Sequence, residues 1–579
     1  MKIHYLLVFL FSISLTAQTP LVGTTVPDLA AYGESTNYVG EAEYQIFLDT
    51  DTGVLDKPII LVDGFDPGDT RSLTGLYDLL DFSGTSGTQN LADLVRAEGF
   101  DVVILNFPMY TRSADMANID GGADFIERNA MLLVDLIGII NADKAANSPE
   151  QNVIIGPSMG GLISRYALNY MEQQSLDHDT RLWMSFDSPH HGANVPLGLQ
   201  HQLNFLANGL DLGGLGDFSV VALQPLIDEF LKSPAARQLL TDHFESHLSA
   251  GSDVEFDPTL LTPEPHPWRT IFTNNMEGLT TSGFPEDTRN VAIINGSGIG
   301  NPYFAMGESG TTVTPGLSVI DLSIPNIAPF TTAVIQSNLT PAIVDGTEAI
   351  SNIRVDFCII GCNDLLNGTG LANAAAFPFS DGIDAAPGGL FDLSGLTGAF
   401  MPDPGSLEES FLNALAIDKF NFIPSVSGMA LTITANGEID WYHDFNLPPG
   451  TPPNGDVLNE TPFVNYYMPD NNEPHVQLTE ANVAFALSEI IPQTLTVSNL
   501  DFGIALDQNP VKDNLIIRSN ETISNATLSV IDLTGKVVLS INTQLTDYNV
   551  IPFNAQSGIY LLRITNSDNL DFKTKIIKQ

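Results

Sequence analysis

The sequence predicts an α/β fold, with a mostly parallel sheet covered by helices on both faces, followed by a small C-terminal β-sandwich. Buried apolar runs of strand length alternate with stretches of helical periodicity, which is the pattern of βαβ units. One such run, Val153–Ile155, ends in Gly156-Pro-Ser-Met-Gly160 and leads directly into a helical pattern. The last stretch, of about 75 residues, contains only short and evenly spaced strand candidates.

The predicted elements follow the chain in alternation. The predicted strands are Ile59–Val62, Phe100–Phe107, Val153–Ile155, Leu182–Phe186 and the run that begins at Val291. The predicted helices are Leu91–Glu98, Ala123–Asn141, the segment after Met159, Trp268 to Gly278, and Val476–Ile491. Because ligands bind at the carboxyl ends of parallel strands, we expect the functional site at that edge of the sheet.

The N-terminus has the pattern of a secretory signal peptide, residues 1–18. Lys2 precedes the apolar run Tyr5–Leu15, and Thr16-Ala17-Gln18 supplies small residues for cleavage. We therefore expect residues 19–492 to form the main domain, with a linker at 493–506 and a separate module at 507–579. No later stretch reaches the ~18 apolar residues of a transmembrane helix, so we expect an exported chain without a transmembrane segment.

The charge balance excludes some partners. The chain has 22 Lys and Arg against 69 Asp and Glu, which gives a formal net charge of -47. So acidic a surface repels nucleic acid and anionic membranes, and neither is expected as a partner. A solvated acidic surface explains the composition; calcium binding or adaptation to salt are the alternatives.

Two insertions interrupt the predicted α/β pattern. Residues 195–261 are rich in Leu, Ala and Gly, with helical stretches such as Leu223–Leu240, and are predicted to cover the site as a lid. Residues 300–420 are expected to be irregular and partly β. They contain both cysteines, Cys358 and Cys362, which form either a disulfide or two buried thiols.

Ser158 is the candidate nucleophile. It lies on a predicted strand-to-helix turn, and Gly156 and Gly160 on either side allow a turn sharp enough to project its hydroxyl above the sheet. A purely structural glycine turn is the alternative. The amides of Phe65, after the first buried strand, and Met159 are the expected backbone donors to an oxyanion. Asp63 stands where many lipases have His before the glycine of this loop.

The candidate base and acid follow Ser158 in the chain. A serine hydroxyl needs a base to accept its proton, and His475, on a loop before the last predicted helix, is the expected base, with His443 as the alternative. The candidate acid is Asp187, at the end of the predicted strand Leu182–Phe186, or Asp384, in a Pro-Gly-Gly turn. Asp364 is a third option. His190 is expected to shape the pocket or donate a hydrogen bond.

No nucleotide or metal motif is present in the sequence. A Gly-x-Gly-x-x-Gly after the first strand, a P-loop lysine motif and His-Glu-x-x-His are all absent. We therefore expect chemistry without a metal ion or an organic cofactor.

Gly156-Pro-Ser-Met-Gly-Gly-Leu-Ile-Ser-Arg-Tyr-Ala-Leu, with Phe186-Asp-Ser-Pro-His-His-Gly-Ala-Asn-Val-Pro, resembles the lipase-like α/β-hydrolases related to the GPI-inositol deacylase group. The resemblance covers roughly residues 57–492. It implies an α/β-hydrolase fold and ester hydrolysis through an acyl-enzyme on Ser158, and it implies no particular substrate.

The tail resembles another family. Asn509-Pro-Val-Lys-Asp-Asn-Leu, Ile531-Asp-Leu-Thr-Gly-Lys and Ser557-Gly-Ile-Tyr are similar to the C-terminal sorting domain (type A) of the Bacteroidota type IX secretion system. The resemblance implies that the secretion machinery is a partner and that the chain is released or attached to the cell surface. A carbohydrate-binding sandwich is the alternative for this module.

Together these features predict a secreted serine hydrolase that cleaves carboxylic esters, lipase- or esterase-like, with a small-molecule or lipid ester as substrate. The alternative from another class is a non-catalytic surface adhesin or glycan-binding protein on a hydrolase-like scaffold. An amidase or a polyester depolymerase is also compatible with the motifs.

Overall fold

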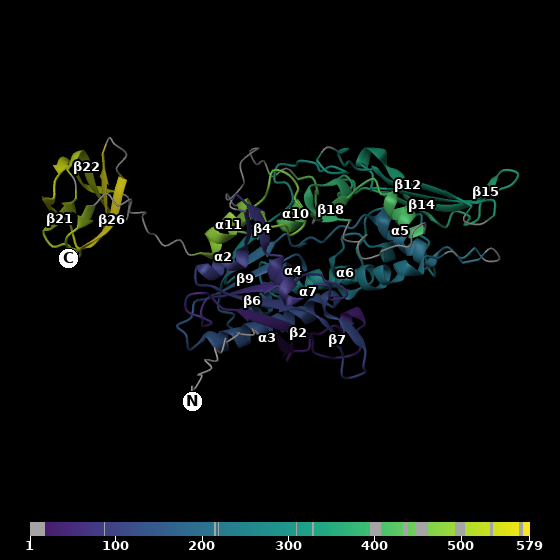
Figure 1. The fold of residues 1–579 in the computed structure, drawn as a ribbon, viewed down its shortest axis with the longest axis horizontal. Helices are drawn as coiled ribbons and strands as arrows, with labels where there is room; N and C mark the ends of the chain where they lie inside the picture. Colours follow the sequence, from purple (N-terminus) through teal and green to yellow (C-terminus); the bar gives the residue numbers. More distant parts are fainter. Residues whose placement is uncertain are drawn as a thin grey trace, which may run out of the picture. The chain divides into compact units, whose positions relative to one another are not determined.

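A computed structural model of the chain describes residues 18–85, 87–212, 216–217, 219–308, 310–326, 329–393, 407–431, 438–443, 445, 461–491, 504–520, 522–532, 536–566 and 571–579 (Figure 1). Contacts divide the chain into two compact units, Met1–Ile491 and Pro492–Gln579. The predicted signal peptide lies outside the described residues except for residue 18. The predicted linker is described only at 504–506, which form a strand.

A mostly parallel sheet of eight strands forms the centre of the first unit, as the sequence predicts. Its order is β1-β2-β6-β3-β9-β10-β11-β19, and every neighbouring pair from β6 to β19 is parallel. Only β1 and β2, at one edge, pair antiparallel. The strands are β1 (Thr19–Val22), β2 (Glu41–Phe47), β3 (Pro58–Val62), β6 (Asp101–Asn106), β9 (Asn152–Pro157), β10 (Thr180–Phe186), β11 (Arg289–Ile293) and β19 (Asn465–Tyr467).

Successive side chains of each strand point to opposite faces of this sheet, so each face has its own apolar core. Helices cover both of these faces. In β3, Ile60 and Val62 belong to one core, and Ile59 and Leu61 belong to the other. The first core is completed by α3 (Ile126–Lys144), α4 (Met159–Gln173) and α7 (Pro267–Glu277). The second is completed by α1 (Leu73–Asp78), α2 (Leu91–Ala97) and α11 (Glu480–Ile490).

The insertion between β10 and β11 is helical but more broken than the sequence suggests. The predicted helix Leu223–Leu240 is instead a 3-10 turn, a π-helix and the short helix α6. Ser233 caps α6 through Ala236 N, and Pro234 occupies its first turn, so the helix starts anew at this point. The segments are α5 (Leu197–Asn208), η4 (Val221–Leu223), η5 (Leu226–Leu231), α6 (Pro234–Leu239) and η6 (Phe244–His247).

Residues 300–420 are more regular than expected, because they form an antiparallel sheet that packs against α5. Its strands are β12 (Ser318–Pro325), β13 (Thr331–Asn338), β14 (Thr347–Cys358), β15 (Cys362–Asp364) and β16 (Leu371–Ala375). Ile335, Ile350 and Ile353 of this sheet share a core with Phe205 of α5. Cys358 and Cys362 form a disulfide.

Shorter elements complete the first unit. β17 (Gly388–Asp392) and β18 (Lys419–Pro424) pair with each other, as do β4 (Asp81–Gly84) with β5 (Gly87–Asn90) and β7 (Met109–Thr111) with β8 (Asn118–Asp120). The remaining helical segments are η1 (Ala30–Tyr32), η2 (Gly121–Ala123), η7 (Ile343–Asp345), η8 (Ile383–Ala385), α9 (Leu407–Asn413) and α10 (Ser425–Gly428).

The second unit is a β-only module with its own core. One sheet has the order β20-β21-β24, and the other has the order β23-β22-β25-β26. The short strands that the sequence predicts for this region are present. They are β21 (Asn514–Ser519), β22 (Ile523–Asp532), β23 (Val537–Leu545), β24 (Tyr548–Pro552), β25 (Gly558–Thr565) and β26 (Asp571–Lys578), with β20 (Ile504–Leu506) in addition. Residues 533–535, between β22 and β23, lie outside the described residues.

Within the part of the chain that the structure describes, no helix has the length and apolar composition that crossing a membrane requires.

Candidate active site

Ser158 occupies a strained turn between β9 and α4. Its backbone has φ 53° and ψ -130°, which residues with side chains rarely adopt and which costs on the order of 1–3 kcal/mol. The turn is tight enough to require both neighbouring glycines. A Cβ on Gly156 would overlap backbone atoms of α4, and one on Gly160 would overlap the Val62 carbonyl of β3. The spacing of the motif thus follows from how closely β9, α4 and β3 approach one another.

A chain of hydrogen bonds joins Ser158, His475 and Asp187. His475 Nδ1 lies 2.7 Å from Asp187 Oδ2, and its Nε2 lies 2.8 Å from Ser158 Oγ. An ionised carboxylate only accepts hydrogen bonds, so Nδ1 donates to Asp187 and Nε2 accepts from the serine hydroxyl. This is the tautomer that a general base at Nε2 requires.

Asp187 is fully buried at the end of β10 and held from several sides. Its N–H donates to Ile293 O at 2.6 Å, and Asn295 N donates to its Oδ1 at 3.1 Å. Gly389, in β17, packs against the carboxylate so closely that a Cβ there would overlap Oδ2. The second insertion therefore encloses the carboxylate that the central sheet positions.

The loop that carries His475 is anchored to the same insertion. His475 N donates to Leu390 O at 2.8 Å, and Leu390 N donates to Glu473 O at 3.0 Å, so this loop pairs with β17. The Phe422 ring of β18 packs edge-on against the imidazole, with ring centroids 5.0 Å apart. These contacts fix the orientation of the imidazole between its two partners.

The loop after β3 lies directly against the turn that carries Ser158. A Cβ on Gly64 would lie 3.1 Å from Ser158 Cβ and 3.6 Å from Met159 N. The chain that leads to Phe65 therefore passes close to the Met159 amide. Arg71 supports this loop, because its Nη2 donates to Phe65 O at 2.8 Å and lies 3.1 Å from Asp63 Oδ1. Burial raises the pKa of Asp63 to about 7, while the Arg71 charge opposes that rise.

The alternative site residues from the sequence lie elsewhere. The Asp384 carboxylate accepts hydrogen bonds from Asn194 Nδ2 at 3.1 Å and Thr340 N at 2.7 Å, within the insertion. Asp364 accepts backbone N–H groups beside β15, and the His443 ring packs against Phe445.

His190 contacts a serine hydroxyl and three aromatic rings. Its Nε2 lies 2.8 Å from Ser185 Oγ, and its ring is buried between Trp183, Phe284 and Phe463. This burial lowers the pKa of His190 well below its usual value. It therefore packs in the core below the sheet edge, and it lines neither of the two cavities described next.

Two mainly apolar cavities flank the site, and a more polar hollow of about 790 Å³ borders the His475 loop at Glu473 and Pro474. The larger apolar cavity, called the larger cavity below, is about 140 Å³ in volume and is lined only by apolar side chains, among them Phe65 and Phe422 and residues of α5, η5 and α6. The smaller, of about 90 Å³, is bordered by Ser158, Gly64 and Arg71 and is otherwise mainly apolar. The helical insertion therefore forms much of the wall of the larger cavity.

Sequence reasoning missed Glu473 and Asn295 near the acid. Asn295 joins the two carboxylates, because its N–H donates to Asp187 and its Nδ2 donates to Glu473 Oε2 at 2.9 Å. Burial raises the pKa of Glu473 to about 7, and the nearby Asp187 adds to the rise. Their positions in the sequence are the only signal for these two residues, since Asn295 follows β11 and Glu473 lies two residues before His475.

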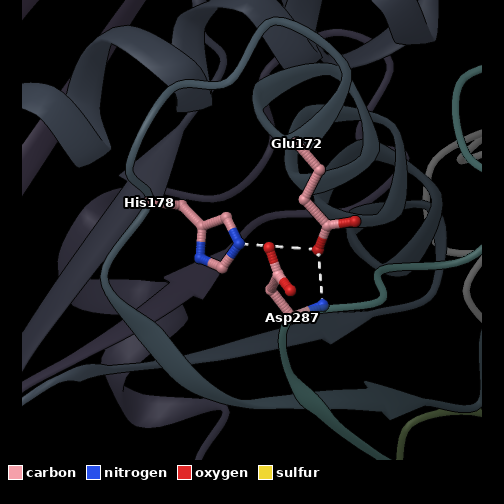
Figure 2. A group of neighbouring side chains, drawn as sticks. All are labelled: Glu172, His178 and Asp287. Carbon is pink, nitrogen blue, oxygen red and sulfur yellow. Dashed lines mark hydrogen bonds and ion pairs between the residues drawn. The ribbon is translucent and has the colours of Figure 1, made fainter.

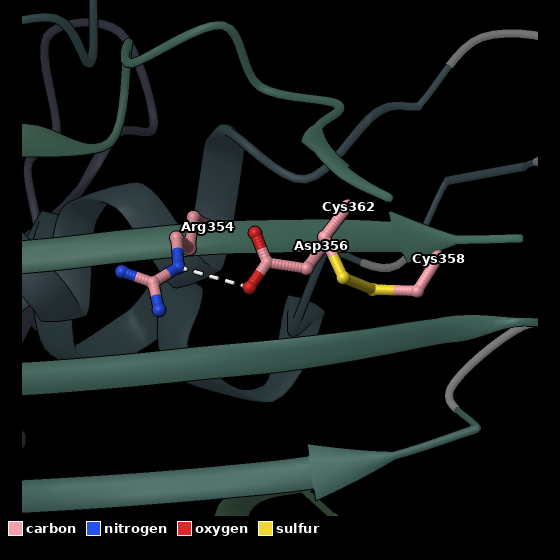
Figure 3. Close-up of a disulfide and its surroundings, with 4 residues drawn as sticks. All are labelled: Arg354, Asp356, Cys358 and Cys362. Atoms are coloured by element: carbon pink, nitrogen blue, oxygen red, sulfur yellow. Dashed lines mark hydrogen bonds and ion pairs between the residues drawn. A yellow bond between two sulfur atoms is a disulfide. The ribbon is translucent and has the colours of Figure 1, made fainter. Parts of the chain in front are cut away.

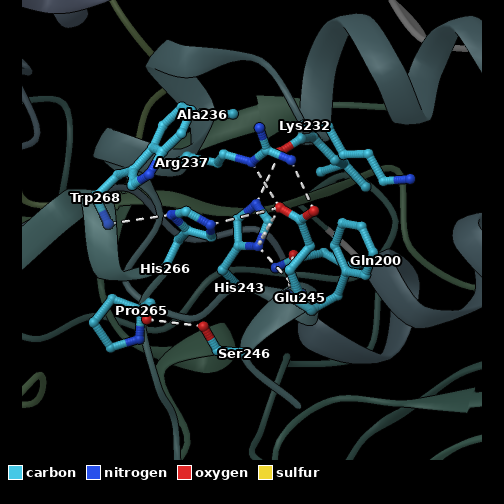
Figure 4. Close-up of polar contacts among 12 residues, drawn as sticks. Gln200, Lys232, Ala236, Arg237, His243, Glu245, Ser246, Pro265, His266 and Trp268 are labelled. Carbon is cyan, nitrogen blue, oxygen red and sulfur yellow. Dashed lines mark hydrogen bonds and ion pairs between the residues drawn. The ribbon is translucent and has the colours of Figure 1, made fainter. Parts of the chain in front are cut away.

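A cluster of polar contacts around His243 and Glu245 lies next to Leu231 and Ala236, which line the larger cavity (Figure 4). Arg237 in α6 makes a bidentate ion pair with Glu245 at 2.7 and 2.8 Å and stacks over the Trp268 ring. His243 donates from Nε2 to Leu231 O at 2.8 Å, and burial lowers the pKa of this histidine. The cluster joins η5, α6, η6 and α7 through satisfied hydrogen bonds, so it has a structural role.

Among the residues that the structure describes, two groups of side chains have the composition of a metal site. In the first, Glu172 lies 3.5 Å from His178 Nε2 and accepts the N–H of Asp287 at 3.0 Å (Figure 2). Burial raises the pKa of Glu172, but these hydrogen bonds outweigh burial and hold it below its usual value. In the second, Asp49 and Asp101 accept several backbone N–H groups. Protein donors use the Glu172 oxygens in the first group and those of Asp49 and Asp101 in the second, whereas Oδ1 of Asp56, the third member of the second group, is buried without a hydrogen-bond partner in the described part of the chain.

Residues 509–579 match the model of the secretion system C-terminal sorting domain. This match confirms the sorting domain that the sequence predicts at the C-terminus. It implies contact with the type IX secretion machinery and a secreted or cell-surface location.

Solved structures similar to this chain include several hydrolases. An α/β serine hydrolase without a lid from Xanthomonas campestris is 14% identical over 30% of this chain and 62% of its own, with a TM-score of 0.20. A peroxisomal α/β-hydrolase from Saccharomyces cerevisiae is 11% identical over 48% of this chain and 73% of its own, with a TM-score of 0.25. An esterase from Pyrobaculum calidifontis is 13% identical over 48% and 74%, with a TM-score of 0.22. No curated protein matches the chain.

Proposed function

We propose that the first unit is a serine ester hydrolase of the α/β-hydrolase fold, and that the chain acts outside the cell. One observation carries the proposal. His475 is within hydrogen-bond distance of both Ser158, at 2.8 Å, and Asp187, at 2.7 Å, although these residues lie far apart in the sequence. A nucleophile, a base and an orienting acid in contact are the constellation that acyl transfer requires.

In the proposed first step, Ser158 Oγ attacks the carbonyl carbon of the ester while His475 Nε2 accepts its proton. The negative charge on the carbonyl oxygen is stabilised by the N–H groups of Phe65 and Met159. When the tetrahedral intermediate collapses, the C–O bond to the alcohol breaks and His475 protonates the leaving oxygen. The acyl group stays on Ser158.

Water completes the cycle. His475 Nε2 removes a proton from water, whose oxygen attacks the acyl-enzyme carbonyl. The second intermediate then releases the carboxylic acid and restores the Ser158 hydroxyl. The Asp187 carboxylate stabilises the imidazolium that forms twice in each cycle.

The larger cavity supports an ester with a sizeable apolar group. It is about 140 Å³ in volume, and an apolar protein cavity of about 150 Å³ binds benzene. Its wall includes Phe65, the proposed oxyanion residue, and Phe422, which contacts His475. The group bound there would displace no polar contact, so its transfer from water is favourable.

Ser158→Ala tests the proposal. We expect kcat for p-nitrophenyl esters of graded chain length to fall by about 10⁴-fold or more, because no nucleophile remains. Ser488→Ala, at an exposed position of α11, is the control and should keep full activity. Unchanged hydrolysis by Ser158→Ala would contradict the proposal and would favour the non-catalytic adhesin or glycan-binding scaffold.

We further propose that residues 1–18 direct export to the periplasm and that the sorting domain then directs passage across the outer membrane. The match of residues 509–579 supports the second step, and the order of charged, apolar and small residues at the N-terminus supports the first. The relation to lipase-like hydrolases of the GPI-inositol deacylase group and an origin in Bacteroidota remain predictions from the motifs.

A further inference from the structure

Two turns at one end of the β12–β16 sheet carry exposed apolar side chains. Phe330, in the turn between β12 and β13, is 64% exposed, and Ile359 and Ile360, between β14 and β15, are 62% and 96% exposed. Cys358 N donates to Phe330 O at 2.9 Å, so the two turns are adjacent. We call these three residues the apolar tip. Figure 1 shows the β15 end of the sheet extending beyond α5.

The apolar tip has no charged residue in its two turns, although the chain as a whole is strongly acidic. Residues 325–331 and 357–363 contain no Asp, Glu, Lys or Arg. Asp356 and Asp364 flank the second of these segments in the sequence, and Asp356 pairs with Arg354 at 3.0 Å (Figure 3). Such a gap in the surface charge removes the main electrostatic barrier to contact with an apolar phase.

The disulfide holds the tip in shape. Cys358 and Cys362 close a short ring that contains Ile359, Ile360 and Gly361. The ring restricts the backbone between the two cysteines, and Gly361 adopts a left-handed conformation that completes the turn. The exposed conformation is therefore fixed before any partner binds, which lowers the entropic cost of binding.

We propose that the apolar tip inserts into the surface of an uncharged or zwitterionic lipid layer. Three side chains are too few for a specific protein interface, which buries roughly 800 Å² on each partner, whereas affinity for a lipid interface scales with the apolar area inserted. The net charge of -47 disfavours anionic lipid. The proposal is independent of the ester hydrolysis proposed above.

The tip and the larger cavity belong to one packed body. The sheet that ends in the tip packs on α5, where Gln202 Nε2 donates to Gln336 O at 2.6 Å and Gly198 fits against the Ile350 carbonyl. On the same helix, Leu199 and Leu203 line the cavity. Insertion of the tip would thus hold the cavity-bearing part of the molecule at the lipid surface.

Binding of the full chain to phosphatidylcholine vesicles, measured by co-sedimentation, tests the proposal. We expect the double variant Ile359→Ser/Ile360→Ser to lower the partition coefficient by about tenfold or more, because two inserted apolar side chains are lost. Val344→Ser is the matched control. Val344 is 90% exposed in the turn between β13 and β14, at the opposite end of the same sheet, and its loss should leave binding unchanged.

Three outcomes would overturn the proposal: no binding of the unaltered chain, equal binding of the double variant, or an equal loss with Val344→Ser. Stronger binding to phosphatidylglycerol than to phosphatidylcholine would also contradict it. Near-ultraviolet circular dichroism checks that each variant is folded without relying on activity. Ser158→Ala should bind as the unaltered chain does, so the binding test and the proposed hydrolysis fail or succeed separately.

Discussion

Asp187 and Asp384 are both buried carboxylates, but they have different partners. Asp187 accepts from His475 Nδ1, whereas Asp384 accepts from Asn194 and Thr340 within the insertion. We therefore expect Asp187→Asn to lower kcat by about 10⁴-fold, because an amide at this position selects the wrong imidazole tautomer. Steady-state kinetics on a soluble ester measures this effect.

Asp384→Asn is the matched variant for that test. It should keep kcat and instead reduce the free energy of unfolding by about 1–3 kcal/mol, since an amide cannot accept all the hydrogen bonds the carboxylate accepts. A larger loss of kcat in Asp384→Asn than in Asp187→Asn would show that the acid has been misassigned.

Asp63 predicts a pH dependence of stability. Burial raises its pKa to about 7 in the folded chain, against about 4 when unfolded. Between these pH values the folded chain retains a proton that the unfolded chain has lost, so this group's contribution to stability falls as the pH rises from about 4 to about 7. Asp63→Asn removes the titration. Relative to this variant, we expect the unaltered chain to lose on the order of 2–4 kcal/mol over that window.

Urea unfolding of both proteins across that pH range measures this difference, and other titrating groups cancel in the comparison. Parallel pH profiles for the two proteins would contradict the assignment. This carboxylate also illustrates the limit of the sequence at the residue scale. Its position before Gly64 is visible in the motif, but its burial and its ion pair with Arg71 depend on how the loop folds back.

At the scale of elements, β17 makes contacts that both His475 and Asp187 depend on. A Cβ on Gly389 would overlap Asp187 Oδ2, so we expect Gly389→Ala to displace the carboxylate and lower kcat by about 10²-fold or more. Gly138→Ala is the control, because Gly138 is exposed in α3 with no neighbour near its added Cβ. That variant should keep kcat and be more stable by about 0.5–1 kcal/mol. Equal kinetics for the two variants would show that β17 does not position the acid.

The sequence predicts the five strands β3, β6, β9, β10 and β11 of the central sheet because their signals are local, and it does not predict β1, β2 and β19. The buried runs of β3, β9, β10 and β11 and the helical spacing of α3 and α4 are both short-range patterns. The second insertion carries no such signal. Its strands β17 and β18 act through contacts with Asp187 and His475, which are distant in sequence. The choice between Asp187 and Asp384 could not be made from the sequence for the same reason.

At the scale of the whole molecule, the chain consists of two units with separate cores. A chain that ends at Ile491 should therefore fold alone and hydrolyse esters with kcat/KM within about twofold of the full chain. The sorting domain should matter for export and not for chemistry. Comparison of kinetics and thermal unfolding between the two chains measures this. A shortened chain that is inactive or unfolded would show that the first unit depends on the second.

Covalent labelling with a fluorophosphonate tests the central claim, that Ser158 is a nucleophile activated by His475. We predict a single adduct on the peptide that contains Ser158, identified by mass spectrometry. His475→Ala should slow its formation by about 10²-fold or more, because no base remains to accept the serine proton. An adduct at another residue, or no adduct on the folded chain, would contradict the account.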